Sequence, residues 1–588
     1  MYQAVYFAEK TSGTFADVLV AYGLAAVLDE ILAQALGRES RRRVWIRDTG
    51  PYYTVTLEEP LRAEWVRNCT YFAGPPAYIT TGQTESAPAG VRVRNVGETW
   101  EQYRNYQAVR EKLRRVSEMT DDFKRQVEDA EPPYDWAVVT FLGTPQMQAL
   151  KTYNQAVTQW ALTREYFTFN LETILRMTAT QHADLETIAR NWRRTVKVPG
   201  VTDKLTAIQL LNPHQGKGQN QAKANALSMG KNIGSFWLLE YLKAAGLWLC
   251  SAPRVVEGST DRKTYVLAPL NVTLATHQAV FKTFSKRLWN ETAVKMDCVA
   301  ALLYTDTLLE YSEAGQYDEL NFEGYGPEHV VAGFHVVQYK LLSRNAFTAI
   351  NLAFLGLPLW TGDLRSRQEV LNLRKVIREH REVIDSIDET RSDGYHLLLR
   401  YRDFLSSQRW DDFFEFAAGY AHYAMSRMAQ GQRWVPLFTT TSLRRLVMTT
   451  SKPLTRIIEN PGFQNVARAI RHSTVIPQGR KARGEHVLYD IRYGLGMELK
   501  RKATVRDDFV AALADFMQSY NQENSQVLER HKQQMRRDLR TTDIEAVVSL
   551  VDEYGPEVVA NLLVAYGYAR EPREDAESGG LANETGTE

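Results

Sequence analysis

At 588 residues the chain is too long for one ordinary hydrophobic core, so we expect roughly two to four domains. An apolar fraction of 44% and a charged fraction of 24% are typical of a soluble globular protein, and a net charge of only +1 means that any nucleic-acid affinity must come from local basic patches. Three widely separated cysteines exclude a disulfide framework and a Cys-rich zinc site. The N-terminus lacks the basic and apolar regions of a signal peptide, and the most apolar stretch, Ala346 to Trp360, is too short to span a bilayer. These features predict a cytoplasmic protein with no membrane association.

The first 270 or so residues combine strand and helix signals. Tyr2 to Phe7 predicts a short strand, and Thr14 with Asp17 resembles a capping box that begins an apolar, buried helix over 15–36. Further elements are predicted in chain order: strands over 44–47 and 52–57, a charged helix over 100–131, a buried strand over 136–142, helices over 146–194 and 235–248, and a strand pair over 254–267 around Glu257-Gly258-Ser259.

Beyond residue 270 the patterns are mainly helical. Helical character is predicted over 277–311, 329–355, 365–404, 410–428 and 507–520. Thr542 with Glu545 makes a second capping-box pattern, and Gly555-Pro556 predicts the end of one helix and the start of the next. The expected fold is therefore α+β, with these parts: a mixed α/β domain (1–270), a mainly helical middle region (271–430), a basic C-terminal helical bundle (431–569) and a disordered acidic tail (570–588).

One stretch, Leu211 to Trp248, stands out because a polar loop precedes an aromatic-rich helix. Between Asn212 and Lys231 there are three lysines and several side-chain amides but no Asp or Glu. Such donors suit phosphate oxygens and base edges. A polar surface loop with a chance run of lysines is the alternative. For the aromatic residues Phe236, Trp237 and Trp248, helical spacing favours the core of the following helix over a role as stacking platforms.

Known catalytic motifs are absent from the sequence. The chain has no Walker A, HExxH, GxSxG or His-Asp pattern, and no two histidines lie three or four residues apart. We therefore expect no catalytic residues, no metal site and no cofactor, although an unrecognised carboxylate site would leave no such motif.

Two segments break the overall neutrality of the chain. From Leu185 to Lys231, eight basic side chains face two acidic ones, a net charge of +6. From Thr441 to Arg506, fourteen face four, a net charge of +10. Either segment can be a solvated basic face. As phosphate contacts, about six to eight such cations would make binding strongly salt-dependent.

Three stretches of the chain together resemble a known family. They are YQAVYFAEKTSGTFADVLVAYGLAAVLDEIL near the N-terminus, NPHQGKGQNQAKANALSMGKNIGSFWLLEYLKAAGLW in the loop and its helix, and RRDLRTTDIEAVVSLVDEYGPEVVANLLVAYGYA near the C-terminus. The chain resembles the large subunit of type I CRISPR effector complexes (Cascade), most closely the group found in I-A and I-B related systems. The resemblance covers about the first 270 and the last 150 residues.

The resemblance implies a non-catalytic subunit of an RNA-guided DNA-binding surveillance complex in antiviral defence. Its N-terminal domain would sit by the 5′ handle of the guide RNA (crRNA), read the protospacer-adjacent motif on double-stranded target DNA and help to open the duplex into an R-loop. Its C-terminal bundle would hold the target or the displaced single strand. The implied partners are the backbone, guide-processing and small subunits of the complex, with a recruited helicase-nuclease or transposition protein as a further one.

Candidate binding residues rest on their chemistry and on the region in which they lie. The base-edge candidates are Asn220, Asn225, Gln219 and Gln215. The backbone candidates are Lys217, Lys223, Lys231, Gly216, Gly218, Arg193, Arg194, Arg444, Arg445, Arg480, Lys481, Lys500, Arg501 and Lys502, with the two glycines allowing close approach of the main chain.

Two other classes of function stay open at this point. The chain can be a stand-alone nucleic-acid-processing enzyme such as a metal-dependent nuclease, or a scaffold whose basic patches bind proteins. A separate hypothesis is that a short C-terminal product starts at an internal methionine, with Met448 the first candidate and Met425 or Met428 the others.

Overall fold

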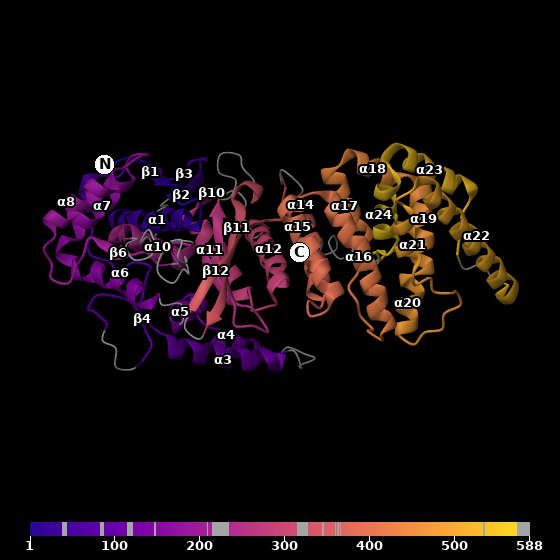
Figure 1. The fold of residues 1–588 in the computed structure, drawn as a ribbon, viewed down its shortest axis with the longest axis horizontal. Coiled ribbons are helices and arrows are strands. Elements are labelled where there is room, and N and C mark those ends of the chain that lie inside the picture. The colour runs from indigo at the N-terminus through magenta and orange to yellow at the C-terminus, as the bar shows by residue number, and fades with distance from the viewer. Residues whose placement is uncertain are drawn as a thin grey trace, which may run out of the picture. The chain divides into compact units, whose positions relative to one another are not determined.

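The computed structural model describes residues 1–37, 44–82, 87–113, 121–145, 149–208, 210–213, 234–313, 327–343, 346–358, 360, 364, 366–532 and 536–572. The chain divides into two compact units (Figure 1). Unit 1 comprises Met1–Met296 and Thr307–Leu357, and unit 2 comprises Asp297–Asp306 and Pro358–Glu588. This division differs from the expected boundaries near residues 270 and 430, because the strands of one sheet in unit 1 extend to residue 356.

Unit 1 mixes helices with short and long strands. Its elements are β1 (Val5–Glu9), α1 (Phe15–Leu36), β2 (Val44–Asp48), β3 (Tyr52–Leu57), α2 (Ala63–Arg67), β4 (Tyr78–Thr80), β5 (Val93–Asn95), α3 (Val96–Leu113), α4 (Asp121–Ala130), α5 (Trp136–Leu142), α6 (Leu150–Leu162), the 3-10 turn η2 (Arg164–Tyr166), α7 (Phe167–Thr178), α8 (Leu185–Thr195), β6 (Lys204–Thr206), β7 (Gly234–Phe236), α10 (Trp237–Cys250), β8 (Ser251–Val255), β9 (Arg262–Pro269), β10 (Asn271–Thr273), α11 (Leu274–Arg287), the 3-10 turn η6 (Pro327–His329), β11 (Val331–Ser343) and β12 (Ala346–Gly356). Helix α12 (Ala293–Tyr311) contributes residues to both units.

Two four-stranded antiparallel sheets form the β part of unit 1. The first has the strand order β1-β3-β2-β10, and the second has the order β12-β11-β9-β8. In the second sheet, Val336 of β11 pairs with Tyr265 on one side and with Ala353 on the other. Smaller pairs join β4 to β5 and β6 to β7.

Helices α1 and α10 pack against each other in the core of unit 1 (Figure 1). The side chain of Thr14 caps α1 by accepting a hydrogen bond from the Ala16 amide at 3.2 Å, and Gly37 with φ 83° ends it. The predicted helix over 15–36 is thus confirmed, including its burial on nearly all faces. The predicted core positions Phe236, Trp237 and Trp248 are also buried.

Two predicted elements of unit 1 are wrong in type. The stretch from Trp136 to Leu142 was expected to be a strand, but it forms helix α5. The prediction failed because a short continuous apolar run has no periodicity that distinguishes a helix from a strand. The stretch over 329–355 was expected to be helical, but β11 and β12 form a long hairpin there. Pairing of β11 with β9 satisfies the backbone groups of this β-branched and aromatic segment in a sheet.

Unit 2 consists of packed helices. They are the middle of α12, followed by α14 (Arg367–Asp385), α15 (Ser392–Ser407), α16 (Trp410–Ala429), α17 (Thr440–Thr450), α18 (Lys452–Glu459), α19 (Pro461–Ser473), α20 (Val475–Ala482), α21 (Leu495–Lys502), α22 (Arg506–His531), α23 (Thr541–Tyr554) and α24 (Pro556–Gly567).

The C-terminal helices largely follow the predicted pattern. Gly555, with φ 87°, ends α23, and Pro556 begins α24. The predicted capping box at Thr542 and Glu545 is wrong. The N-cap is Arg540, two residues before Thr542, and Asp543 accepts a hydrogen bond from the Arg540 amide at 2.9 Å. Met448 lies inside α17, so a product starting there would begin within a helix.

The α+β fold with a helical C-terminal region is confirmed. Cys69, Cys250 and Cys298 are buried thiols outside any disulfide. Within the described ranges, no helix combines the length and the apolar character needed to cross a membrane. The expected disordered tail lies almost wholly outside the described residues, which end at Pro572.

Candidate nucleic-acid interface

The acid-free loop falls in residues 214–233, outside the described residues. The candidates that lie there are Gln215, Gly216, Lys217, Gly218, Gln219, Asn220, Lys223, Asn225 and Lys231. The two flanks of the loop are described. The upstream flank ends at Pro213, and the downstream flank begins with β7, which pairs with β6.

A buried polar triad attaches the upstream flank to α10. Lys243 Nζ donates to Asn212 Oδ1 at 2.5 Å and to Glu240 Oε1 at 2.8 Å. Asn212 Nδ2 donates to Glu240 Oε2 at 2.9 Å, which closes the triangle. All three residues are buried, so the charges of the ion pair are compensated where water is scarce. Asn212, expected to be part of the polar loop, therefore has a structural role.

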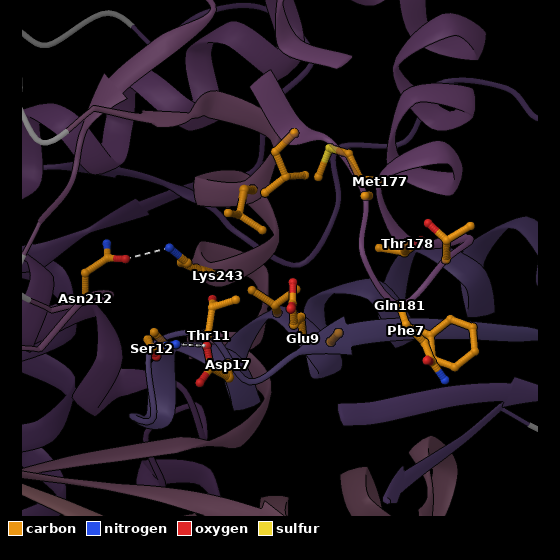
Figure 2. Close-up of a pocket in the computed structure, with 17 residues that line it drawn as sticks. Phe7, Glu9, Thr11, Ser12, Asp17, Met177, Thr178, Gln181, Asn212 and Lys243 are labelled. Carbon is orange, nitrogen blue, oxygen red and sulfur yellow. Dashed lines mark hydrogen bonds between the residues drawn. The ribbon is translucent and has the colours of Figure 1, made fainter. Parts of the chain in front are cut away.

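A cavity of about 350 Å³ lies beside this triad, between the β1–α1 connection, the end of α7, and α10 (Figure 2). Glu9 and Asp17 line it, and its lysine, Lys243, is already paired with Glu240. Burial raises the pKa of Asp17, while hydrogen bonds from Ser12 oppose that shift. A wall with two carboxylates and one neutralised cation is unsuited to phosphate, so this cavity is not the phosphate site expected near the loop.

The downstream flank packs next to α8, which carries Arg193 and Arg194. Trp192 of α8 is buried against Phe236 and Trp237, with ring centroids 6.0 and 5.4 Å apart. Both arginines are exposed on α8, but Arg193 Nη1 donates to the Val201 carbonyl at 2.8 Å. Part of the basic residues from 185 to 231 therefore lies beside the end of the loop.

In unit 2, acidic residues from outside the basic segment neutralise several of its cations. Arg492 pairs with Glu523, Lys502 with Asp508, and Arg506 with Asp552. The net charge of +10 counted over 441–506 therefore overstates the exposed positive charge, because folding brings in carboxylates that the sequence window excludes.

The seven basic candidates of unit 2 separate into two groups. Arg444 pairs with Glu459 at 3.2 Å, and burial lowers the pKa of Lys500, with Glu415 opposing the shift. These two, with Lys502 and the half-buried Arg445, are partly committed to contacts within the fold. The remaining three are exposed: Arg480, Lys481 and Arg501.

Arg480 and Lys481 form the most open pair of cations among these candidates. They lie in the last turn of α20, and Lys481 Nζ donates to the Tyr493 hydroxyl at 3.2 Å. Arg480 forms no ion pair within the part of the chain that the structure describes. A cation beside an exposed aromatic ring is a common arrangement in sites for single-stranded nucleic acid.

Sequence reasoning missed Arg433 and Trp434, which lie in the connection between α16 and α17. Trp434 is 74% exposed, the highest value among the exposed large apolar residues. It lines a hollow with Arg433, Arg480 and Arg483. The signal that could have indicated this site is an Arg-Trp pair between Gly431 and Pro436, where a large aromatic residue has no helical or strand period to explain it.

No protein-family model matches this chain, and no curated protein sequence matches it. Among the residues that the structure describes, no cluster of His, Cys, Asp or Glu is arranged to hold a metal ion.

Proposed function

We propose that the chain is a nucleic-acid-binding, non-catalytic large subunit of a cytoplasmic RNA-guided DNA-binding complex. In this proposal it recognises the protospacer-adjacent motif on duplex DNA and stabilises the opened target strand. Guide RNA, target DNA and the other subunits of the complex are its partners.

The observation that carries the proposal is the exposed basic surface of unit 2 around Arg480 and Lys481. These side chains project from a helical scaffold, and the nearby acidic residue Glu485 is paired with Arg483 at 2.6 Å. Exposed cations attract phosphate and release condensed counterions when they bind it. The flanks of the acid-free loop support a second contact in unit 1, because Asn212 and β7 hold both ends of that loop to packed elements.

The first test is a pull-down of the tagged full-length chain expressed with the genes that neighbour it, followed by sequencing of bound RNA. We expect short RNAs of uniform length with a shared 5′ end, together with several other subunits. Recovery of the chain alone, without RNA, would contradict a guide-complex role. Divalent-metal-dependent cleavage of DNA by the pure chain would contradict the non-catalytic role.

The loop candidates are tested in the assembled complex. Asn220→Ala and Asn225→Ala should each weaken binding to duplexes with the preferred adjacent motif by roughly 5- to 150-fold, with little change for scrambled motifs. Gln181→Ala, on the wall of the cavity in Figure 2, serves as a control in unit 1 outside the loop. Equal losses on all duplexes would mean that the two asparagines do not read bases.

A further inference from the structure

We propose that the hollow around Trp434 is a binding site for one unstacked base of a single-stranded nucleic acid, with Trp434 as the stacking platform and the surrounding arginines as phosphate ligands. The inference deepens the proposed function and rests on it for the biological origin of the strand. The binding itself requires only the folded chain.

The size and the charge of the hollow fit a nucleotide. Its volume is about 600 Å³, within the range of small-ligand sites. Five of the residues that line it are arginines, against a single acidic residue, Glu571. Phosphate diesters are the biological polyanions that combine repeated charge with flat aromatic groups, so this charge pattern is complementary to a polynucleotide.

The five arginines do not have the same role. Arg570 is held by main-chain hydrogen bonds to Phe438 and Thr440, and its charge acts on Glu379. Arg471 is buried, pairs with Glu571 at 2.7 Å and donates from Nη2 to the Tyr566 carbonyl at 2.8 Å, so it belongs to the fold. Arg483 is paired with Glu485 on the surface. Arg433 and Arg480 are exposed and form no ion pair within the described parts of the chain. These two are the phosphate ligands that the structure assigns.

The connection that carries Trp434 is held on both sides. Before it, the Gln432 amide donates to the Arg427 carbonyl at 3.1 Å. After it, the Tyr420 hydroxyl donates to the Pro436 carbonyl at 2.6 Å, and Phe438 is buried against His380. The exposed indole is therefore presented by an anchored backbone, which lowers the entropic cost of stacking a base on it.

A single strand fits this site better than a duplex does. In a duplex, both faces of each base are covered by neighbouring bases, whereas an exposed indole needs a free base face. Stacking on an aromatic side chain accepts every base, so the site is expected to show little sequence preference.

A second hollow of about 230 Å³ shares Arg471 and Glu571 with the first and adds Arg444 and Arg468. Arg468 lies 4.0 Å from Glu571, so this acidic residue faces cations of both hollows. In this proposal the strand continues from Trp434 toward the second hollow.

The test measures binding of the purified full-length chain to two labelled probes by fluorescence anisotropy. One probe is an oligothymidylate of about 20 nucleotides, and the other is an abasic strand of the same length, which keeps the phosphates and removes the bases. Trp434→Ala should weaken oligothymidylate binding by roughly 5- to 150-fold and leave binding of the abasic strand unchanged. Trp434→Phe should retain most of the affinity, because a phenyl ring still stacks.

Two further variants separate the contributions of charge and stacking. Arg480→Ala should weaken the binding of both probes. It should also reduce the steepness of log affinity against log salt by roughly 0.7 for each phosphate that the side chain no longer neutralises. Tyr395→Ala removes another exposed aromatic ring, which lies on α15 outside both hollows. This variant should bind both probes as tightly as the wild type.

The proposal is overturned if Trp434→Ala binds oligothymidylate like the wild type, or if it weakens both probes equally. It is also overturned if the wild type binds poly-glutamate as tightly as oligothymidylate, because the hollow would then be a site for acidic proteins. A pull-down without RNA or other subunits would contradict the guide-complex role but would not affect these binding measurements. The two proposals can therefore be contradicted independently.

Discussion

His380 lies in the aromatic centre of unit 2 and shows how a single buried group makes stability depend on pH. Its ring stacks on Phe413 with centroids 5.2 Å apart, and its Nδ1 is 2.9 Å from the Tyr401 hydroxyl. Burial lowers the pKa of His380 from 6.5 to about 3. Below pH 6.5 the unfolded chain therefore binds a proton at this histidine, whereas the folded chain does not. The free energy of unfolding consequently decreases as the pH falls from 6.5 toward 3.

We expect His380→Phe to make the free energy of unfolding less dependent on pH. Between pH 6 and pH 4, the variant takes up about one proton fewer on unfolding than the wild type does. The slope of its free energy of unfolding against pH should therefore be smaller by about 1.4 kcal/mol per pH unit. Denaturant titrations at several pH values in that range, on wild type and variant, measure the difference. Parallel curves for the two proteins would contradict a neutral, buried His380.

At the scale of elements, the close packing of α1 against α10 depends on a glycine from each helix. A Cβ atom on Gly23 would lie 2.0 Å from the Leu242 carbonyl oxygen, and one on Gly246 would lie 2.1 Å from that of Leu19. Both partners are backbone atoms of the opposite helix, so they cannot move aside as a side chain can. The close approach of these helices positions the triad of Asn212, Glu240 and Lys243, because the latter two residues lie on α10.

Gly246→Ala is expected to destabilise unit 1 by about 1–3 kcal/mol, because the added methyl group overpacks the contact between α1 and α10. Gly82→Ala is the matched control, since a Cβ there meets nothing within 4 Å. Urea unfolding of the two variants measures the contrast. Equal stability of Gly246→Ala and the wild type would mean that the helices separate without cost.

At the scale of the whole molecule, unit 2 is built from two separated parts of the chain. The middle of α12 supplies Asp297, which pairs with Arg402 at 2.8 Å, and Asp306, which pairs with Arg374 at 2.8 Å. Asp297 is wholly buried. The helices after residue 358 therefore depend on carboxylates that precede the β11–β12 hairpin in sequence.

A fragment of residues 358–588 should be less stable than the same residues in the full chain. Removing one partner of a buried ion pair typically costs about 3–5 kcal/mol, because the other charge is left without compensation. Hydrogen exchange of α14 and α15, compared between fragment and full chain, measures the difference. Asp297→Asn in the full chain is the matched variant and should raise exchange in α15, which carries Arg402, more than in α18. Identical protection of α15 in all three proteins would contradict this dependence.

Local sequence patterns determined the elements whose signals lie within the element itself. Helix α1 has its cap, its apolar faces and its terminal glycine in one stretch, and Gly555-Pro556 marks a helix boundary through backbone geometry alone. The same local information failed for α5 and for the β11–β12 hairpin, since a short apolar run suits either helix or strand until its neighbours are known.

Only the tertiary structure decided which charges are free and which aromatic residue is exposed. Glu523 and Asp508, both outside the basic segment, neutralise Arg492 and Lys502. Within the segment, Glu459 pairs with Arg444, and burial lowers the pKa of Lys500. Arg480 stays exposed, and Trp434 lies in the same hollow although 46 residues separate the two along the chain (480 minus 434). Composition measures how much charge a segment contains, but the packing of distant segments determines how much of that charge faces solvent.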